Sequence, residues 1–217
     1  MKTILIIDDM ELLNNIFVEV LQNEGYSVYS SISGLNGIEK LKSIKTDLIL
    51  LDIMMPVMDG WETLDYIRSD PEISDIPVIM MTAKKLFPDD IFQYGDLISG
   101  YIKKPLKIES LINCINSFFK NKEEIEIFIK NTALKTSDYE KALAVGKTAE
   151  DMLFFRMVID KLIDINSEDD SADIDDGPIV DIERLNSHFD NLQRKFTEQI
   201  TGLGVREYIP VSLLGYI

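Results

Sequence analysis

Five polar residues stand at or just beyond the ends of short apolar runs in the first half of the chain: Asp8, Asp9, Asp52, Thr82 and Lys104. If these runs are strands of one parallel sheet, their carboxyl ends bring the five side chains to the same edge. Three converging carboxylates repel one another and need a cation, and an all-oxygen site suits a hard ion such as Mg²⁺. Lys104 would then supply a mobile positive charge and Thr82 a hydroxyl group. These residue types therefore predict a magnesium site that also receives phosphate oxygens.

The elements that must position these residues follow from the apolar pattern. The runs predict five strands, over Thr3–Ile7, Tyr26–Ser30, Asp47–Leu51, Ile76–Met81 and Gly100–Ile102. Between the runs, apolar residues recur at helical spacing. Strands that are apolar throughout, each followed by a helix, indicate a parallel sheet covered on both faces. We expect an α/β domain with a doubly wound five-stranded sheet, whose site lies beyond the carboxyl ends of the strands.

Four short motifs give the first half a family resemblance. They are Ile-Ile-Asp8-Asp9, Leu-Leu-Asp52-Ile-Met-Met-Pro56-Val-Met-Asp59-Gly60, Met-Thr82-Ala83 and Tyr101-Ile-Lys-Lys104-Pro105. In this order, and at the predicted strand ends, they resemble the receiver domain of bacterial and archaeal response regulators over roughly residues 1–120. The resemblance implies the flavodoxin-like arrangement of the sheet.

The resemblance also implies the chemistry of the site. Asp52 would be the phosphoacceptor, a carboxylate nucleophile that attacks a phosphohistidine of a sensor histidine kinase or phosphotransfer protein. Mg²⁺ would be ligated by Asp9, Asp52 and the backbone carbonyl of Met54, with Asp8 contributing through water. Such a protein is not an enzyme toward other substrates, since it assists only its own phosphorylation and dephosphorylation.

Three further residues acquire roles from the resemblance. Lys104 would pair with one phosphoryl oxygen and Thr82 would donate a hydrogen bond to another, because phosphoryl transfer is mostly positioning and charge neutralisation. Tyr101 would be the switch aromatic that swings inward when Thr82 is drawn to the phosphoryl group. The pair Asp59-Gly60 is expected to form a turn with Gly60 at positive φ.

Two other α/β families fit less well. A dinucleotide-binding Rossmann domain needs a G-x-G-x-x-G motif after the first strand, where this chain has Asp-Asp-Met. A phosphatase similar to the haloacid dehalogenases would carry a second Asp two residues after the nucleophile, where this chain has Met54.

The apolar spacing in residues 121–217 predicts a smaller, mostly helical module of unrecognised type. Ser137 and Glu140 could form a capping box at a helix start, and apolar residues from Met152 to Ile163 predict an amphipathic helix. An acidic loop is expected near residues 167–177. The apolar positions from Ile182 to Phe196 step by three and four, which is coiled-coil spacing. This seam could mediate self-association or pack within the chain, and the last residues, 205–217, could form a strand or hairpin.

Composition restricts the partners and the location. The chain of 217 residues has 22 basic and 38 acidic residues, a net charge of −16, and residues 122–217 hold 11 basic and 20 acidic ones. This balance disfavours binding to nucleic acid or to an anionic membrane. No apolar run is long enough for a membrane span or a signal peptide, so a cytoplasmic location is expected. We therefore expect signalling through phosphorylation-dependent protein contacts. A transcriptional regulator with an unrecognised DNA-binding output is the alternative.

Overall fold

A computed structural model describes residues 1–83, 88–168 and 182–217, without the side chains of residues 82, 88–90, 161–168 and 182. The chain divides into two compact units. Unit 1 comprises Met1–Leu86 and Asp90–Asn113, and unit 2 comprises Phe87–Asp89 and Cys114–Ile217.

Unit 1 is built on a five-stranded parallel sheet with the order β2-β1-β3-β4-β5. The strands are β1 (Thr3–Ile7), β2 (Ser27–Ser31), β3 (Leu48–Asp52), β4 (Val78–Thr82) and β5 (Gly100–Lys103). Every neighbouring pair is parallel. The predicted doubly wound sheet is confirmed, and the predicted strand bounds are within two residues of the observed ones.

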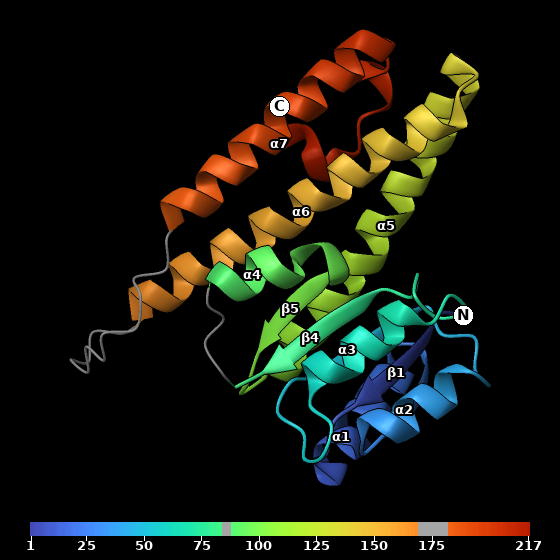
Figure 1. Cartoon of the computed structure of the whole chain (residues 1–217), viewed down its shortest axis with the longest axis vertical. Helices are drawn as coiled ribbons and strands as arrows, with labels where there is room; N and C mark the ends of the chain where they lie inside the picture. The colour runs from blue at the N-terminus through green and yellow to red at the C-terminus, as the bar shows by residue number, and fades with distance from the viewer. Residues whose placement is uncertain (84–87, 169–181) are drawn as a thin grey trace. The chain divides into compact units, whose positions relative to one another are not determined.

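Helices cover both faces of this sheet. They are α1 (Glu11–Asn23), α2 (Gly34–Leu41), α3 (Gly60–Ser69), α4 (Pro88–Tyr94) and the start of α5 (Ile108–Thr136), with a 3₁₀ turn, η1 (Gly95–Leu97), after α4 (Figure 1). All five residues of β3 are buried although their side chains alternate between the two faces. A strand buried on both faces explains why its sequence, Leu-Ile-Leu-Leu-Asp, is apolar without alternation.

Unit 2 is helical, as predicted. It contains most of α5, then α6 (Tyr139–Glu168), α7 (Ile182–Leu203) and two 3₁₀ turns, η2 (Arg206–Tyr208) and η3 (Val211–Tyr216). The predicted strand or hairpin over residues 205–217 is wrong. Ser212 N–H donates to Glu124 Oε2 at 3.0 Å, and Gln193 Nε2 donates to the Tyr216 carbonyl at 2.6 Å. These bonds tie the terminal turns to α5 and α7, which satisfies backbone groups that a hairpin would have paired.

The residue that caps α6 differs from the predicted one, Ser137. Asp138 caps the helix, since its Oδ1 accepts from the Lys141 N–H at 3.0 Å. Ser137 instead has a φ of 56° and turns the chain between α5 and α6. Of the predicted acidic loop, residues 167 and 168 belong to α6, and the others lie outside the described residues.

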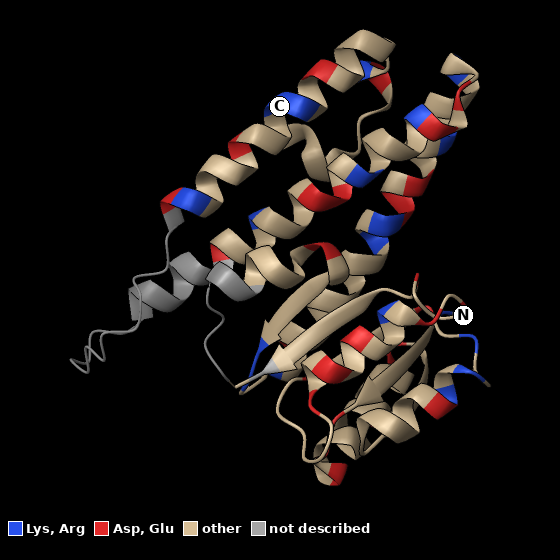
Figure 2. Cartoon of the chain, viewed as in Figure 1, with Lys and Arg blue, Asp and Glu red and all other residues tan. Residues whose placement is uncertain are grey.

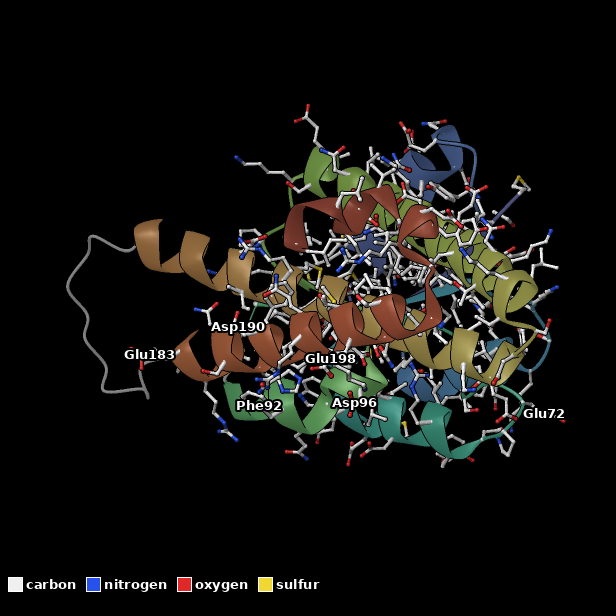
Figure 3. All side chains as sticks on the ribbon, turned by 90° about the horizontal axis from the view of Figure 1, so that it is seen from above. Glu72, Phe92, Asp96, Glu183, Asp190 and Glu198 are labelled. Carbon is white, nitrogen blue, oxygen red and sulfur yellow. The ribbon has the colours of Figure 1, made fainter. Side chains whose placement is uncertain are left out.

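The coiled-coil seam packs inside the chain. Leu185, Phe189, Leu192 and Phe196 are buried against the rest of unit 2. The ring centroids of Phe128 and Phe196 lie 5.9 Å apart. The spacing left two outcomes open, and the structure shows packing within the chain, while self-association of unit 2 stays a prediction. Charged positions of both signs stay exposed on α7, among them Glu183, Asp190 and Glu198 (Figure 3).

Within the described part of the chain, no helix combines the length and the apolar character required to cross a membrane.

Candidate functional site

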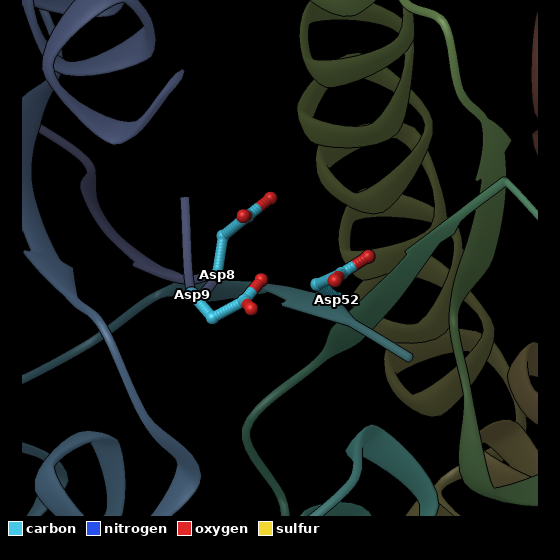
Figure 4. Close-up of side chains that lie close together, drawn as sticks. All are labelled: Asp8, Asp9 and Asp52. Atoms are coloured by element: carbon cyan, nitrogen blue, oxygen red, sulfur yellow. The ribbon is translucent and has the colours of Figure 1, made fainter. Parts of the chain in front are cut away.

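Three carboxylates meet at the carboxyl edge of the sheet in unit 1. Asp8 and Asp9 follow β1 directly, and Asp52 is the last residue of β3. One oxygen from each lies within 4.8 Å of the others (Figure 4). Asp8 is fully buried and Asp52 is 4% exposed, whereas Asp9 is exposed. The register pairs Ile7 with Leu51, which places the ends of β1 and β3 at the same level.

Lys104 joins this cluster from the segment after β5. Its Nζ lies 2.5 Å from Asp8 Oδ2 and 2.9 Å from Asp52 Oδ1. The first contact is a hydrogen bond. The second is an ion pair without hydrogen-bond alignment, so Asp52 Oδ1 is a buried oxygen that lacks a hydrogen-bond donor. Asp52 thus keeps capacity to bind a further group.

Burial and charge act against each other in this cluster. Burial raises the pKa of the Asp52 carboxyl, and the neighbouring Lys104 ammonium opposes part of that rise. Burial would lower the pKa of Lys104, but its contacts with the carboxylates of Asp8 and Asp52 outweigh this effect and raise the pKa. Three carboxylates and one ammonium leave two uncompensated negative charges when all are ionised. A divalent cation would balance them, and the hard oxygen donors suit Mg²⁺.

Asp8 is positioned by a residue that sequence analysis did not identify. Asn14 is 1% exposed, and its Nδ2 donates to the Asp8 carbonyl at 2.7 Å and to the Ser31 carbonyl at 3.3 Å. The Met10 N–H also donates to Asp8 Oδ1 at 3.0 Å. Asn14 shares the buried face of α1 with Phe17. An amide on an otherwise apolar helix face was the signal available in the sequence.

The loop from β3 to α3 is held tightly behind Asp52. Asp59 and Glu62 form a capping box, with bonds of 2.9 and 3.0 Å between each side chain and the other's backbone N–H. The Gly60 N–H donates to the Ile53 carbonyl at 2.9 Å. A Cβ at Gly60 would lie 2.3 Å from the Asp52 carbonyl oxygen. Gly60 is not among the glycines with positive φ, so that expectation is wrong. Glycine is needed at this position because the backbone of Asp52 and Ile53 approaches it closely.

The remaining predicted residues lie around the same edge. Tyr101, in β5, is 4% exposed. Thr82 ends β4 and its backbone pairs with Lys103, but its side chain is outside the described set, so the predicted hydroxyl contact stays a prediction. Met54, two residues past Asp52, is 47% exposed in the loop before α3. The structure therefore gathers Asp8, Asp9, Asp52 and Lys104 as the residue types indicated.

Comparison with known proteins agrees with this geometry. Residues 4–116, just over half of the chain, match the family model of the response regulator receiver domain. The probable transcriptional regulator ycf29 of Pyropia yezoensis is 30% identical over 161 residues, which cover 74% of this chain and 71% of that protein. The DNA-binding dual master transcriptional regulator RpaA of Synechocystis sp. is 29% identical, over 62% of this chain and 56% of that protein.

A solved structure gives the same result for the fold. The CheY-like receiver domain protein from Methanospirillum hungatei aligns with a TM-score of 0.52 and 27% identity, covering 57% of this chain and 98% of that one. With the family match, the parallel sheet and the acidic cluster at its carboxyl edge, the chain belongs to the response regulator receiver-domain family.

Proposed function

We propose that this protein is a response regulator that accepts a phosphoryl group on Asp52 from a sensor histidine kinase or phosphotransfer protein. The observation that carries the proposal is the convergence of Asp8, Asp9 and Asp52 within 4.8 Å beside Lys104. In this proposal residues 1–120 are the phosphoacceptor domain and residues 121–217 an interaction module. The protein would work in the cytoplasm, with the kinase.

The chain's own residues have distinct tasks in the transfer. A carboxylate oxygen of Asp52 attacks the phosphorus, the P–N bond to the donor histidine breaks, and an acyl phosphate forms. Lys104 leaves its contact with Asp52 and pairs with a phosphoryl oxygen, while Thr82 donates a hydrogen bond to another. Mg²⁺ held by Asp9, Asp52 and the Met54 carbonyl, with Asp8 beside it, would neutralise charge on the transferred group.

The test of this assignment is chemical labelling of the full chain. With acetyl phosphate and Mg²⁺, the wild type should gain one base-labile phosphoryl group, and Asp52→Asn should gain none. Asp59→Asn is the matched control, because asparagine still caps α3 and Asp59 lies outside the acidic cluster. Excess chelator should abolish labelling without unfolding the protein. Labelling of Asp52→Asn at the wild-type rate, or undiminished labelling in chelator, contradicts the assignment.

The output is proposed to be phosphorylation-dependent contact with another protein, in which Thr82 and Tyr101 link Asp52 to the surface that the partner reads. The composition of unit 2 supports this, because acidic and basic side chains are interspersed along α5, α6 and α7 (Figure 2). Affinity capture with phosphorylated wild type and with Asp52→Asn should yield a partner that depends on phosphorylation. Identical capture by both proteins contradicts the proposal.

A transcriptional role is the alternative, and the names of the relatives ycf29 and RpaA favour it. The alignment to ycf29 spans 161 residues, whereas the receiver match ends at residue 116. The alignment must therefore include part of the chain that follows the receiver domain. Against this stands the acidic excess of residues 122–217, which hold 11 basic and 20 acidic residues. Fluorescence anisotropy with duplex DNA at low and high salt separates the two. Tight, salt-sensitive binding after phosphorylation would replace protein contact by DNA contact as the output.

A further inference from the structure

Helix α3 is attached to the α4–η1 segment by an aromatic stack. Trp61, the second residue of α3, lies face to face with Tyr94, the last residue of α4. Their ring centroids are 4.1 Å apart and the rings are inclined by 17°. Both rings are half-buried. A stacked pair of this kind adds stabilisation beyond the apolar area that it buries, and it fixes the orientation of both rings.

A second attachment lies at the other end of α3. Arg68 Nε donates to the Leu97 carbonyl at 2.9 Å, in the 3₁₀ turn that follows α4. Its Nη1 donates to the carbonyls of Ser74 and Ile76 at 2.6 and 3.0 Å, in the connection that leads to β4. A guanidinium is suited to this task, because its donors point in fixed directions and can hold several carbonyls at once. The segment is thus held to α3 at both Tyr94 and Leu97.

The first turn of α3 is itself fixed to the phosphoacceptor backbone. Gly60, next to Trp61, donates to the Ile53 carbonyl, and a Cβ on Gly60 would lie 2.3 Å from the Asp52 carbonyl oxygen and 2.7 Å from Ile53 Cα. The two backbone segments are packed directly against each other at this contact. A displacement of the backbone at Asp52 and Ile53 must therefore move the start of α3. Trp61 is the next residue along that helix.

We propose that Trp61 and Arg68 are positioning residues that relay the state of Asp52 through α3 to residues 91–97. The inference rests on the proposed phosphorylation of Asp52 and adds a route to it. A phosphoryl group shifts an equilibrium only through contacts that differ between the two states. Among the described residues, the stack of Trp61 on Tyr94 and the bond from Arg68 to Leu97 are contacts that α3 can strengthen or release when its first turn moves.

The experiment uses the full chain with and without acetyl phosphate and Mg²⁺. Trp61 is the only tryptophan, so intrinsic emission reports on the stack directly. Amide hydrogen exchange across residues 91–97 reports on the segment. The variants are Tyr94→Leu, which removes the ring, and Tyr94→Phe, which keeps it. Tyr66→Leu is the matched control, since Tyr66 is an exposed aromatic residue of the same helix α3.

Phosphorylation of the wild type should change both signals. In Tyr94→Leu, labelling of Asp52 should proceed at the wild-type rate, while the phosphorylation-dependent difference in exchange should shrink about three- to tenfold, as expected from loss of one stacked pair. Tyr94→Phe should restore the difference, and Tyr66→Leu should leave it intact. A merely structural stack would alter exchange equally in the two states, so the difference between states is the decisive quantity.

Two results overturn the relay and leave the proposed function standing. One is a labelled wild type whose Trp61 emission and exchange at residues 91–97 do not change. The other is a Tyr94→Leu protein that responds to phosphorylation as the wild type does. Failure of Asp52 to label in the wild type is a different result, which overturns the proposed function and the relay together.

Discussion

At the scale of single residues, Lys104 decides whether the buried carboxylates are tolerated. Its ammonium contacts both Asp8 and Asp52, whose side chains are almost completely buried. Removing one partner from a buried ion pair leaves uncompensated charge, which typically costs about 3–5 kcal/mol. We expect Lys104→Met to lower the free energy of unfolding by up to that amount without Mg²⁺, and to recover part of it when Mg²⁺ is added. Urea denaturation with and without the ion measures both effects.

The adjacent Lys103 provides the control for this prediction, because its side chain is exposed. Lys103→Met should change the unfolding free energy little in either condition. Equal destabilisation by the two substitutions, or a loss at position 104 that Mg²⁺ does not affect, would show that Lys104 is a packing residue. It would then not be the counter-charge of the site.

Asp52 gives a prediction for the dependence of stability on pH. Its pKa lies above the ordinary value of 3.8 because burial disfavours the carboxylate, and Lys104 offsets only part of this. The folded protein therefore binds this proton more tightly than the unfolded chain, so folding stability falls as pH rises from 3.8 through the raised pKa. Asparagine cannot ionise. The stability of Asp52→Asn relative to wild type should increase across this window and stay constant above it.

Urea denaturation in chelator over a series of pH values measures this difference. The same series on Asp47→Asn serves for comparison, since Asp47 is an acidic residue outside the cluster whose carboxylate accepts from the Thr3 N–H at 2.8 Å. A stability difference between wild type and Asp52→Asn that is independent of pH would mean that burial does not control the titration of Asp52.

The acidic cluster could be predicted from the sequence because each member ends or follows an apolar run. Parallel strands bring such ends together whatever the details of packing. The amide of Asn14 on an apolar helix face could be noticed in the sequence, but the partners of Asn14 and Arg68 could not be predicted in the same way. Their partners are backbone carbonyls at Asp8, Ser31, Ser74, Ile76 and Leu97, and no sequence pattern marks a carbonyl that needs a donor. Tertiary packing decides those contacts.

At the scale of elements, the tight turn from β3 into α3 depends on Gly60. A Cβ there would meet the backbone of Asp52 and Ile53, which cannot rotate away as a side chain can. We expect Gly60→Ala to destabilise the protein by about 1–3 kcal/mol, the usual cost of overpacking, and to slow labelling of Asp52. Gly202→Ala is the control, because a Cβ at this position in α7 would meet open space. It should stabilise the helix by up to about 1 kcal/mol.

Thermal unfolding and acetyl phosphate labelling of both alanine variants check this prediction. Gly60→Ala with wild-type stability and wild-type labelling would show that α3 can shift freely away from Asp52. That result would also weaken the relay through Trp61, which needs a firm contact at Gly60.

Helix and strand bounds show where sequence patterns suffice. The strands were predictable within two residues because an apolar run surrounded by polar residues is a strong local signal. The residue that caps α6 was not, because Ser137 and Asp138 are both good caps by type. The choice between them depends on how α5 and α6 meet. There Gly146 lets the helices approach so closely that a Cβ would lie 2.4 Å from the Ile129 side chain.

At the scale of the whole molecule, the seam of α7 shows that a sequence pattern predicts an apolar surface but does not predict which element packs against it. Steps of three and four predict an apolar stripe, and the stripe exists. Whether it meets a second chain or its own chain depends on helices elsewhere in the sequence. Here Phe128 of α5 supplies the partner for Phe196, so the stripe is already used. Any partner of unit 2 must therefore contact its exposed side chains.

The two units should also differ in how they lose structure. Phe196 is fully buried in unit 2, and replacing a buried phenylalanine with alanine typically costs about 3–5 kcal/mol. We expect Phe196→Ala to unfold unit 2 at a lower urea concentration than wild type, while Asp52 in unit 1 still labels at the wild-type rate. Far-ultraviolet circular dichroism follows the helices, and acetyl phosphate labelling at each urea concentration follows the site. Leu134→Ala is the control, since Leu134 is 73% exposed on α5 and should change neither curve. If labelling is lost in step with the helical signal, the units unfold as one cooperative body. Unit 2 would then support the phosphoacceptor site, and its role as a separate interaction module would have to be abandoned.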